Sequence, residues 1–335
     1  MSGRWTETRK MLLSAAIVAA IMLPMPVLLA PYPLLILCYA LVFAIACMGL
    51  NLLFGTAGLL SLGHATFFAI SAYAGAFLYR FTPVESFESY LIFGLSISVL
   101  FAAVIGFICL RATRIHFTIL TLAFCQIVYS LFINGFAFRL FGGEGRALYY
   151  LADGGMYIPR LTLLGTRFGP DEFIPAFYNV IVFFFIASTA LLWRIGRSPF
   201  GMALRGIRDN AERAEGVGIP VRHYRWVAFV ISGALVGLAG ALYGQLNRQI
   251  TPEQLHWLFS AKLVLATVLG GLRHFLGPLL GAFAFVSLED VALSWTVYHN
   301  LLLGVLLIVV VFLFPSGLAG AATALVERIR RPGTN

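Results

Sequence analysis

Runs of about 20 residues without a charged side chain recur along the whole sequence and limit the folds open to it. A helix needs about 20 apolar residues to cross the hydrocarbon core of a bilayer. The segment 257–318 has room for about three such helices, with boundaries blurred around Gly270, Gly271 and Gly277. The clearest single runs are 11–30, 34–54, 58–79, 89–110, 115–138, 173–193 and 226–246.

The composition fits the same interpretation. Hydrophobic residues make up 60% of the chain and charged residues only 11%, whereas soluble domains average about 25% charged residues. A cleaved signal peptide does not explain this, because the apolar runs continue long after the first one. We therefore predict an all-α polytopic membrane protein, a single transmembrane domain over 1–335 with about ten spans and a range of eight to eleven.

The basic residues give these spans an orientation, because loops rich in Lys and Arg stay in the cytoplasm. With ten spans and a cytoplasmic N-terminus, 16 basic residues fall inside and seven outside, while the acidic residues divide five inside and nine outside. Both termini are thus predicted to be cytoplasmic. The net charge of +9 follows from this topology beside a lipid bilayer, and we expect no nucleic acid partner.

Two segments are longer than simple connectors. Residues 139–172 have balanced charge and are predicted to be periplasmic, whereas 194–225 carry seven arginines against Asp209, Glu212 and Glu215 and are predicted to be cytoplasmic. Between Pro199 and Gly216 the pattern favours one short amphipathic helix. Such a helix could rest on the membrane surface or dock a cytoplasmic partner, and the pattern does not choose between them.

Residues 210–220, Asn-Ala-Glu-Arg-Ala-Glu-Gly-Val-Gly-Ile-Pro, resemble the coupling-loop signature of ABC importer permeases. Residues 203–218 resemble the branched-chain amino-acid permeases in particular. So does the run from Met48 to Phe68, which contains Phe-Gly-Thr-Ala-Gly-Leu-Leu-Ser-Leu-Gly-His. Further matches lie in 228–243, 267–281 and 314–318, so that the resemblance covers roughly residues 40–320.

The resemblance implies the permease subunit of an importer for branched-chain amino acids or related small solutes, spanning the bacterial inner membrane several times. Its implied partners are two nucleotide-binding ATPase subunits, a second permease of the H type and a periplasmic solute-binding protein. An internal duplication of spans 2–5 and 7–10 is also implied. The residues implied to couple this chain to the ATPase are Arg205, Arg208, Asp209, Glu212, Ala214, Gly216 and Gly218.

Within the family, the long outer segment favours the M-type subunit. The family commonly has Gly-Gly-Ser/Thr-Asp/Asn-Gly there, whereas this chain has Gly-Gly-Glu-Gly-Arg at 142–146. That departure leaves the solute open, with urea, short-chain amides and aromatic acids as alternatives to branched-chain amino acids.

The sequence has no motif for ATP binding, metal binding or catalysis. A phosphate-binding loop of the form G-x-x-x-x-G-K-[ST] is missing, since neither Lys10 nor Lys262 follows a glycine. ATP would therefore be used by the partner, and we expect no cofactor on this chain.

The four cysteines lie in apolar runs without metal-site spacing and are predicted to be core residues. Without paired carboxylates, a nucleophile triad or a metal constellation, we predict that the chain is not an enzyme.

An ion- or proton-coupled secondary carrier is the alternative. Such carriers usually place Asp, Glu or His at mid-membrane, where a charge is costly enough to need a role. Here Glu289 and Asp290 lie toward the outer end of a span and Lys262 near the outer start of another. His116 is expected to lie at a membrane interface or to serve packing, so that His64 is the remaining candidate.

Two glycine-rich breaks interrupt the apolar pattern, at 55–64 and 270–281. Paired interruptions are typical of broken helices along a substrate route, but glycines also serve turns and close helix packing. Both interpretations stay open, and the same holds for Gly233, Gly237 and Gly240, which predict a tight helix contact within the chain or with a second permease. The candidate translocation residues are Gly55, Gly58, Ser61, Gly63, His64, Gly270, Gly271 and Gly277.

Overall fold

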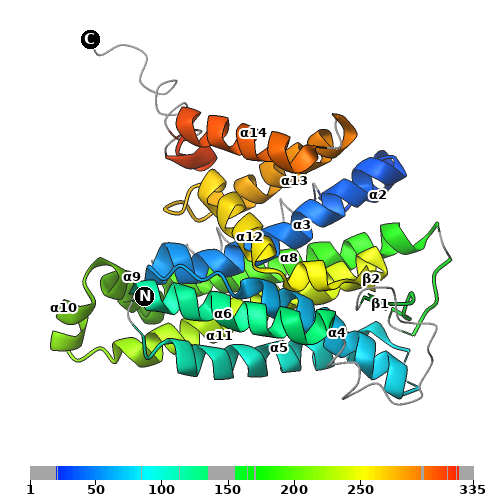
Figure 1. Ribbon diagram of the computed structural model, residues 1–335. Coiled ribbons are helices and arrows are strands. Elements are labelled where there is room, and N and C mark those ends of the chain that lie inside the picture. Colours follow the sequence, from blue (N-terminus) through cyan, green and yellow to red (C-terminus); the bar gives the residue numbers. More distant parts are fainter. Residues whose placement is uncertain are drawn as a thin grey trace, which may run out of the picture.

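The structure, a computed structural model, is a bundle of helices that carries one small two-stranded sheet at one end (Figure 1). It describes residues 20, 22–83, 85–112, 114–134, 155–163, 165–169, 171–295, 298–314, 316–321 and 323. The helices of its first half are α2 (Met25–Leu28), α3 (Pro31–Asn51), α4 (His64–Phe81), α5 (Phe87–Cys109) and α6 (Arg114–Ile133). Those of its second half are α8 (Phe173–Arg197), α9 (Pro199–Asp209), α10 (Ala211–Gly216), α11 (Val221–Asn247), α12 (Trp257–Gly270), α13 (Gly277–Trp295) and α14 (His299–Leu313).

The predicted all-α polytopic fold is confirmed. Among the described residues, six helical segments are long and apolar enough to cross a membrane. They are Pro31–Thr56, Phe87–Cys109, Ile115–Ile133, Phe173–Arg197, Val221–Asn247 and Gly277–Trp295. The segment 257–318, which was predicted to hold about three spans, forms α12, α13 and α14. Of these, α13 is one of the six, whereas α12 has 14 residues and α14 has 15.

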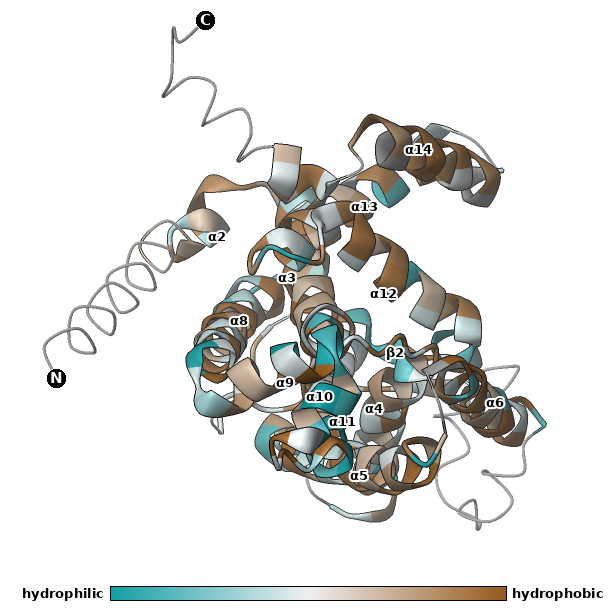
Figure 2. Ribbon diagram, turned by 90° about the vertical axis from the view of Figure 1, so that its left-hand side faces the viewer, coloured by the Kyte–Doolittle hydropathy of each residue, from teal (hydrophilic) through white to brown (hydrophobic). Residues whose placement is uncertain are grey.

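The long helices run side by side, so that the bundle has two ends. One end carries α9 and α10, and we call it the α9 end (Figure 1). The other carries β1 (Met156–Tyr157) and β2 (Gln249–Ile250), which pair antiparallel, and we call it the sheet end. Figure 2 shows hydrophilic residues gathered on α10, whereas α12 and α14 are mostly hydrophobic.

The glycines of α11 allow the central helices to pack closely. A Cβ on Gly240 would lie 1.7 Å from the carbonyl oxygen of Phe68 in α4, and one on Gly237 would lie 2.2 Å from Oγ of Ser98 in α5. Ala102 of α5 faces Gly233 at 2.5 Å in the same way. The tight contact predicted from the spacing of these glycines is therefore made within the chain.

The predicted span 58–79 begins too early. A π-helical segment, Leu52–Thr56, follows α3, and α4 begins only at His64. Gly58 has a φ of +72°, a left-handed conformation that breaks a helix and that glycine adopts at low cost. Residues 58–63 are therefore an irregular connection rather than the first turns of a span.

Parts of other predictions lie outside the described residues. These parts are residues 11–19 and 21 of the span 11–30, the last residues of the span 115–138, and residues 139–154 with the Gly-Gly-Glu-Gly-Arg run. In the described remainder of the outer segment, β1 pairs with β2, and Thr162 forms a bridge with Ser86. His116 is exposed in the first turn of α6, at the α9 end.

The ionisable residues predicted near the outer ends of spans meet at the sheet end. Lys262 of α12 and Glu289 of α13 form an ion pair with 2.5 Å between Nζ and Oε1. Tyr32 of α3 donates a hydrogen bond of 2.5 Å to Asp290. These contacts fasten α3, α12 and α13 together near one end.

Candidate functional site

The segment predicted as one cytoplasmic helix forms two helices, α9 and α10. The Ser198 hydroxyl accepts a hydrogen bond of 3.2 Å from the Gly201 amide and caps α9, whose first residue is Pro199. Asn210 then adopts an extended backbone, and its side-chain oxygen accepts from the Arg213 amide at 2.9 Å. The prediction of a single helix was wrong because this Asn side chain caps a new helix instead of continuing the first.

One side of each helix is buried and the other is exposed. Leu204, Ile207 and Ala214 pack inward, while Glu212 and Glu215 are exposed. Gly218, two residues after the end of α10, has a φ of +85°, and the Ile219 amide donates to the Ala214 carbonyl at 3.0 Å. A Cβ on Gly216 or Gly218 would meet no atom within 4 Å. This end of the molecule therefore presents charged side chains and open glycines.

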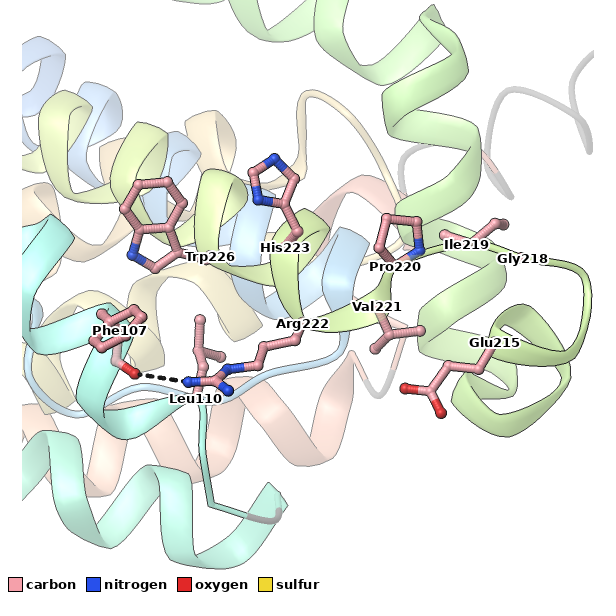
Figure 3. Close-up of a pocket in the computed structure, with 10 residues that line it drawn as sticks. All are labelled: Phe107, Leu110, Glu215, Gly218, Ile219, Pro220, Val221, Arg222, His223 and Trp226. Atoms are coloured by element: carbon pink, nitrogen blue, oxygen red, sulfur yellow. Dashed lines mark hydrogen bonds between the residues drawn. The ribbon is translucent and has the colours of Figure 1, made fainter.

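A groove of about 820 Å³ runs beside α10, between the start of α11 and the end of α5 (Figure 3). Arg222 donates to the Phe107 carbonyl at 3.5 Å, and Trp226 donates from Nε1 to the Ala103 carbonyl at 2.9 Å. Glu215 lies at the α10 side of this groove (Figure 3). Apolar residues such as Phe107 and Leu110 thus line the groove together with the charged Glu215 and Arg222.

Arg208 points from α9 into the bundle, toward the first glycine-rich break. Its Nη1 donates a hydrogen bond of 2.7 Å to the Gly55 carbonyl oxygen, and its Nε lies 3.1 Å from Asp209. A Cβ on Gly58 would lie 2.6 Å from Cγ of Arg208. The structure therefore brings together a predicted coupling residue and two predicted translocation residues.

The second break is a tightly packed turn at the α9 end. It connects α12 to α13, and a Cβ on Gly270 would lie 1.8 Å from the Gly277 carbonyl oxygen. Gly271 has a φ of +104°, and Gly317 approaches it closely. A Cβ on Gly55 would lie 2.7 Å from the Leu272 carbonyl oxygen. The two breaks therefore contact each other beside α9.

The far end of the first break lies deeper. His64, the first residue of α4, is fully buried, and its Nε2 lies 2.8 Å from Oγ of Ser232. Ser232 follows Val221, the first residue of α11, by 11 residues, which is about 16 Å along a helix axis. A Cβ on Gly63 would lie 2.7 Å from the Thr121 carbonyl oxygen of α6. The helix α4 therefore starts inside the bundle, whereas the second break lies at the α9 end of the bundle.

Sequence reasoning missed several residues of this region. Ser232 is a hydrogen-bond partner of His64 but lies 168 residues from it in sequence, so that no local pattern pointed to this contact. Asn210 carried a usable signal, since Asn is among the preferred N-cap residues. Among the described residues no group of His, Cys, Asp or Glu side chains is placed to hold a metal ion, and all four cysteines are buried and free.

Comparison with known proteins gives a consistent result. Residues 32–311 match the family described as the permease component of the branched-chain amino acid transport system. The chain is 27% identical over 333 residues to the high-affinity branched-chain amino acid transport system permease protein LivM of Escherichia coli, covering 93% of this chain and 75% of that protein. It is 24% identical over 288 residues to LivH of Salmonella typhimurium, covering 83% and 91%. No solved structure matches the chain.

Proposed function

This chain belongs to the family of permease components of branched-chain amino acid transport systems, and we propose that it carries branched-chain amino acids or related small solutes across the bacterial inner membrane. It is a multi-pass membrane permease subunit of an ABC importer. The names of the relatives support branched-chain amino acids as the first solutes to test.

A separate ATPase drives the transport in this proposal. Two nucleotide-binding subunits serve the complete importer, and one of them docks on the exposed side of α9 and α10, where Glu212, Gly216 and Gly218 are accessible. The observation that carries the proposal is the bond from Arg208 to Gly55, because it joins this exposed surface directly to a break in a membrane-spanning segment. A movement of α9 would then displace Gly55 and the residues around it.

The remaining partners complete the importer. A second permease of the H type pairs with this M-type chain, and a periplasmic solute-binding protein delivers the solute at the sheet end. The chain itself binds no cofactor and performs no chemistry on the solute, since ATP is hydrolysed by its partner.

The first break is the proposed part of the solute route. Residues 58–63 lie outside a helix, and some of their backbone groups are bonded within the chain, as the Leu62 amide is to the Thr121 hydroxyl at 3.3 Å. Backbone groups at such an interruption can meet a polar solute where a spanning helix is broken. His64 and Ser61 lie at the end of the break that is buried in the bundle, and Gly55 lies at the end next to α9. The packed turn at Gly270, Gly271 and Gly277 would then act as the support against which the first break moves.

Glu212→Arg and Gly216→Leu test the docking surface. Neither change disturbs the packing of this chain, because Glu212 is exposed and a Cβ on Gly216 meets nothing within 4 Å. Losing a central docking contact costs about 2 kcal/mol, or roughly thirtyfold in affinity. We expect co-purification of the ATPase subunit with the permease to fall accordingly, with Gly304→Leu in α14, also free of near neighbours, as the matched control.

Uptake assays separate this proposal from its alternative. Vesicles that contain both permeases, the ATPase and an external binding protein should take up leucine only when ATP is inside. Unchanged ATPase binding by both docking variants would contradict the docking surface. Leucine uptake driven by an ion gradient, in vesicles that contain only this chain, would instead support a coupled carrier.

A further inference from the structure

A second cavity, of about 580 Å³, lies at the α9 end between α9 and the turn that connects α12 to α13. Its charged lining is basic: among the described residues around it there are four arginines and no Asp or Glu. Arg208 is bonded to Gly55 and Asp209, and Arg205 donates from one Nη to the Gly196 carbonyl at 2.8 Å. Arg197 and Arg273 complete the set. A guanidinium has five N–H donors, so that an arginine with one such contact can still bind an anion. The cavity is therefore suited to an anion.

The cavity also has an apolar wall. Phe275, Leu276 and Leu280 line it and are 40%, 51% and 42% exposed. Leu280 belongs to α13, a helix long and apolar enough to span the membrane. An occupant that satisfies both walls needs an anionic group and a hydrocarbon chain in one molecule.

Trp193 and Arg197 indicate the depth of the cavity in the membrane. Both line it, and the Arg197 guanidinium lies over the Trp193 ring, 4.1 Å from its centroid. Trp side chains concentrate at the headgroup level, where a neighbouring Arg can reach water. The cavity thus lies at the headgroup level of the leaflet on the α9 side, which the arginine distribution assigns to the cytoplasm.

Asn51 supplies a further polar contact. Asn51 also lines the cavity, and its side-chain oxygen is buried next to Gly55 with no hydrogen-bond partner among the described residues. A buried acceptor without a partner is costly, so that a ligand carrying a hydroxyl donor would relieve it. Phosphatidylglycerol carries such hydroxyls beside its phosphate.

We propose that this cavity is a binding site for an anionic phospholipid with a hydroxyl-bearing headgroup. Arg197, Arg205 and Arg273 hold the phosphate, and the Asn51 oxygen accepts from the glycerol headgroup. One acyl chain lies along Phe275, Leu276 and Leu280. Basic cavities between helices at the cytoplasmic side are a known form of lipid recognition. A carboxylate of a partner protein would use the arginines but leave the exposed apolar wall uncovered.

Native mass spectrometry of the purified full chain, titrated with phosphatidylglycerol or phosphatidylcholine of identical acyl chains, tests the site. The wild-type chain should retain phosphatidylglycerol in preference. Each arginine near an anionic headgroup contributes about fivefold in affinity, so that Arg197→Gln with Arg273→Gln should weaken phosphatidylglycerol binding roughly thirtyfold. The matched control is Arg111→Gln with Arg194→Gln, which removes two exposed arginines from the same end but outside the cavity; it should change binding by less than about threefold.

Two further measurements test whether the cavity binds a lipid, a free anion or a partner protein. Leu276→Ser with Leu280→Ser should weaken phosphatidylglycerol binding and leave the binding of soluble glycerol phosphate unchanged. Equal binding of the two lipids, or unchanged lipid binding by the arginine or leucine variants, would overturn the proposal. Loss of the retained lipid on assembly of the complete importer would overturn it as well, because the cavity would then be a subunit contact.

Discussion

The Arg208 guanidinium of α9 donates a hydrogen bond of 2.7 Å to the carbonyl oxygen of Gly55, in the π-helical segment that follows α3. A hydrogen bond from a charged donor contributes about 1.5–3 kcal/mol. Gly58 leaves the space for it, since a Cβ there would lie 2.6 Å from Cγ of Arg208. A displacement of α9 must therefore either break this bond or move the end of the spanning segment Pro31–Thr56.

Arg208→Ala should uncouple ATP hydrolysis from transport. The exposed docking surface remains, so that the ATPase still binds and hydrolyses ATP, but the movement no longer reaches Gly55. The loss of about 1.5–3 kcal/mol of coupling corresponds to a fall of roughly tenfold or more in solute molecules moved per ATP. Parallel measurements of leucine uptake and phosphate release in reconstituted vesicles give this ratio.

Gly58→Ala is the matched variant for the same link. A Cβ at this φ of +72° is strained and also displaces the Arg208 side chain, so that the ratio of transport to hydrolysis should fall in a similar way. Met202→Ala changes an exposed residue of α9 away from the contact and should leave the ratio unchanged. A wild-type ratio in the Arg208→Ala importer would show that α9 acts through another contact.

His64 has hydrogen-bond partners on both sides of its ring. Ser232 Oγ donates to the Gly49 carbonyl at 2.7 Å, so that its oxygen accepts from His64 Nε2–H at 2.8 Å. The opposite nitrogen, Nδ1, then accepts from the Ser61 hydroxyl at 2.9 Å. The chain of bonds therefore assigns the Nε2-protonated tautomer and joins α3, α4 and α11.

His64→Ala should destabilise the permease, because it leaves the Ser61 hydroxyl without an acceptor and Ser232 without a donor in a buried site. Each such loss costs about 1–3 kcal/mol. Ser232→Ala breaks the same chain of bonds, and the double variant should lose clearly less than the sum of the two single losses. Denaturant unfolding in detergent micelles measures these losses, and strict additivity would show that the bonds are independent.

The sequence predicted the larger organisation because length and hydrophobicity determine which segments cross a membrane. The limits of the apolar runs lie close to those of α3, α5, α8 and α11, and Gly233, Gly237 and Gly240 correctly indicated a close helix contact. Charge and resemblance together predicted the α9–α10 region, although not its division at Asn210.

The rest depended on contacts between residues distant in sequence. Hydropathy cannot distinguish the connection 58–63 from a helix, because its residues are as apolar as a span. Thr121 of α6 bonds the Leu62 amide within the connection, and Arg208 of α9 and Ser232 of α11 bond Gly55 and His64 on either side of it. The same holds for the arginine-lined cavity, whose walls are brought together only by the fold.

Asn210→Ala should weaken ATPase docking indirectly. The Asn210 side chain caps α10 by accepting from the Arg213 amide at 2.9 Å, and losing such a cap costs about 1 kcal/mol of helix stability. A helix of six residues has little stability to lose, so that the docking conformation becomes less populated and affinity falls by roughly fivefold. Asn210→Ser restores the cap and should restore binding in the same pull-down titration, whereas equal losses in both variants would mean that Asn210 contacts the ATPase itself.

Gly240→Ala should strongly destabilise the helix bundle. The added Cβ would lie 1.7 Å from a backbone carbonyl of α4, which cannot rotate away. Separating α11 from α4 to relieve this clash should cost about 1–3 kcal/mol. Gly304→Ala in α14 is the matched control, since its Cβ meets nothing within 4 Å and alanine is the better helix former. Thermal unfolding of the two variants in detergent should therefore move in opposite directions from the wild type, and a loss of similar size in both would mean that α4 and α11 can separate at little cost.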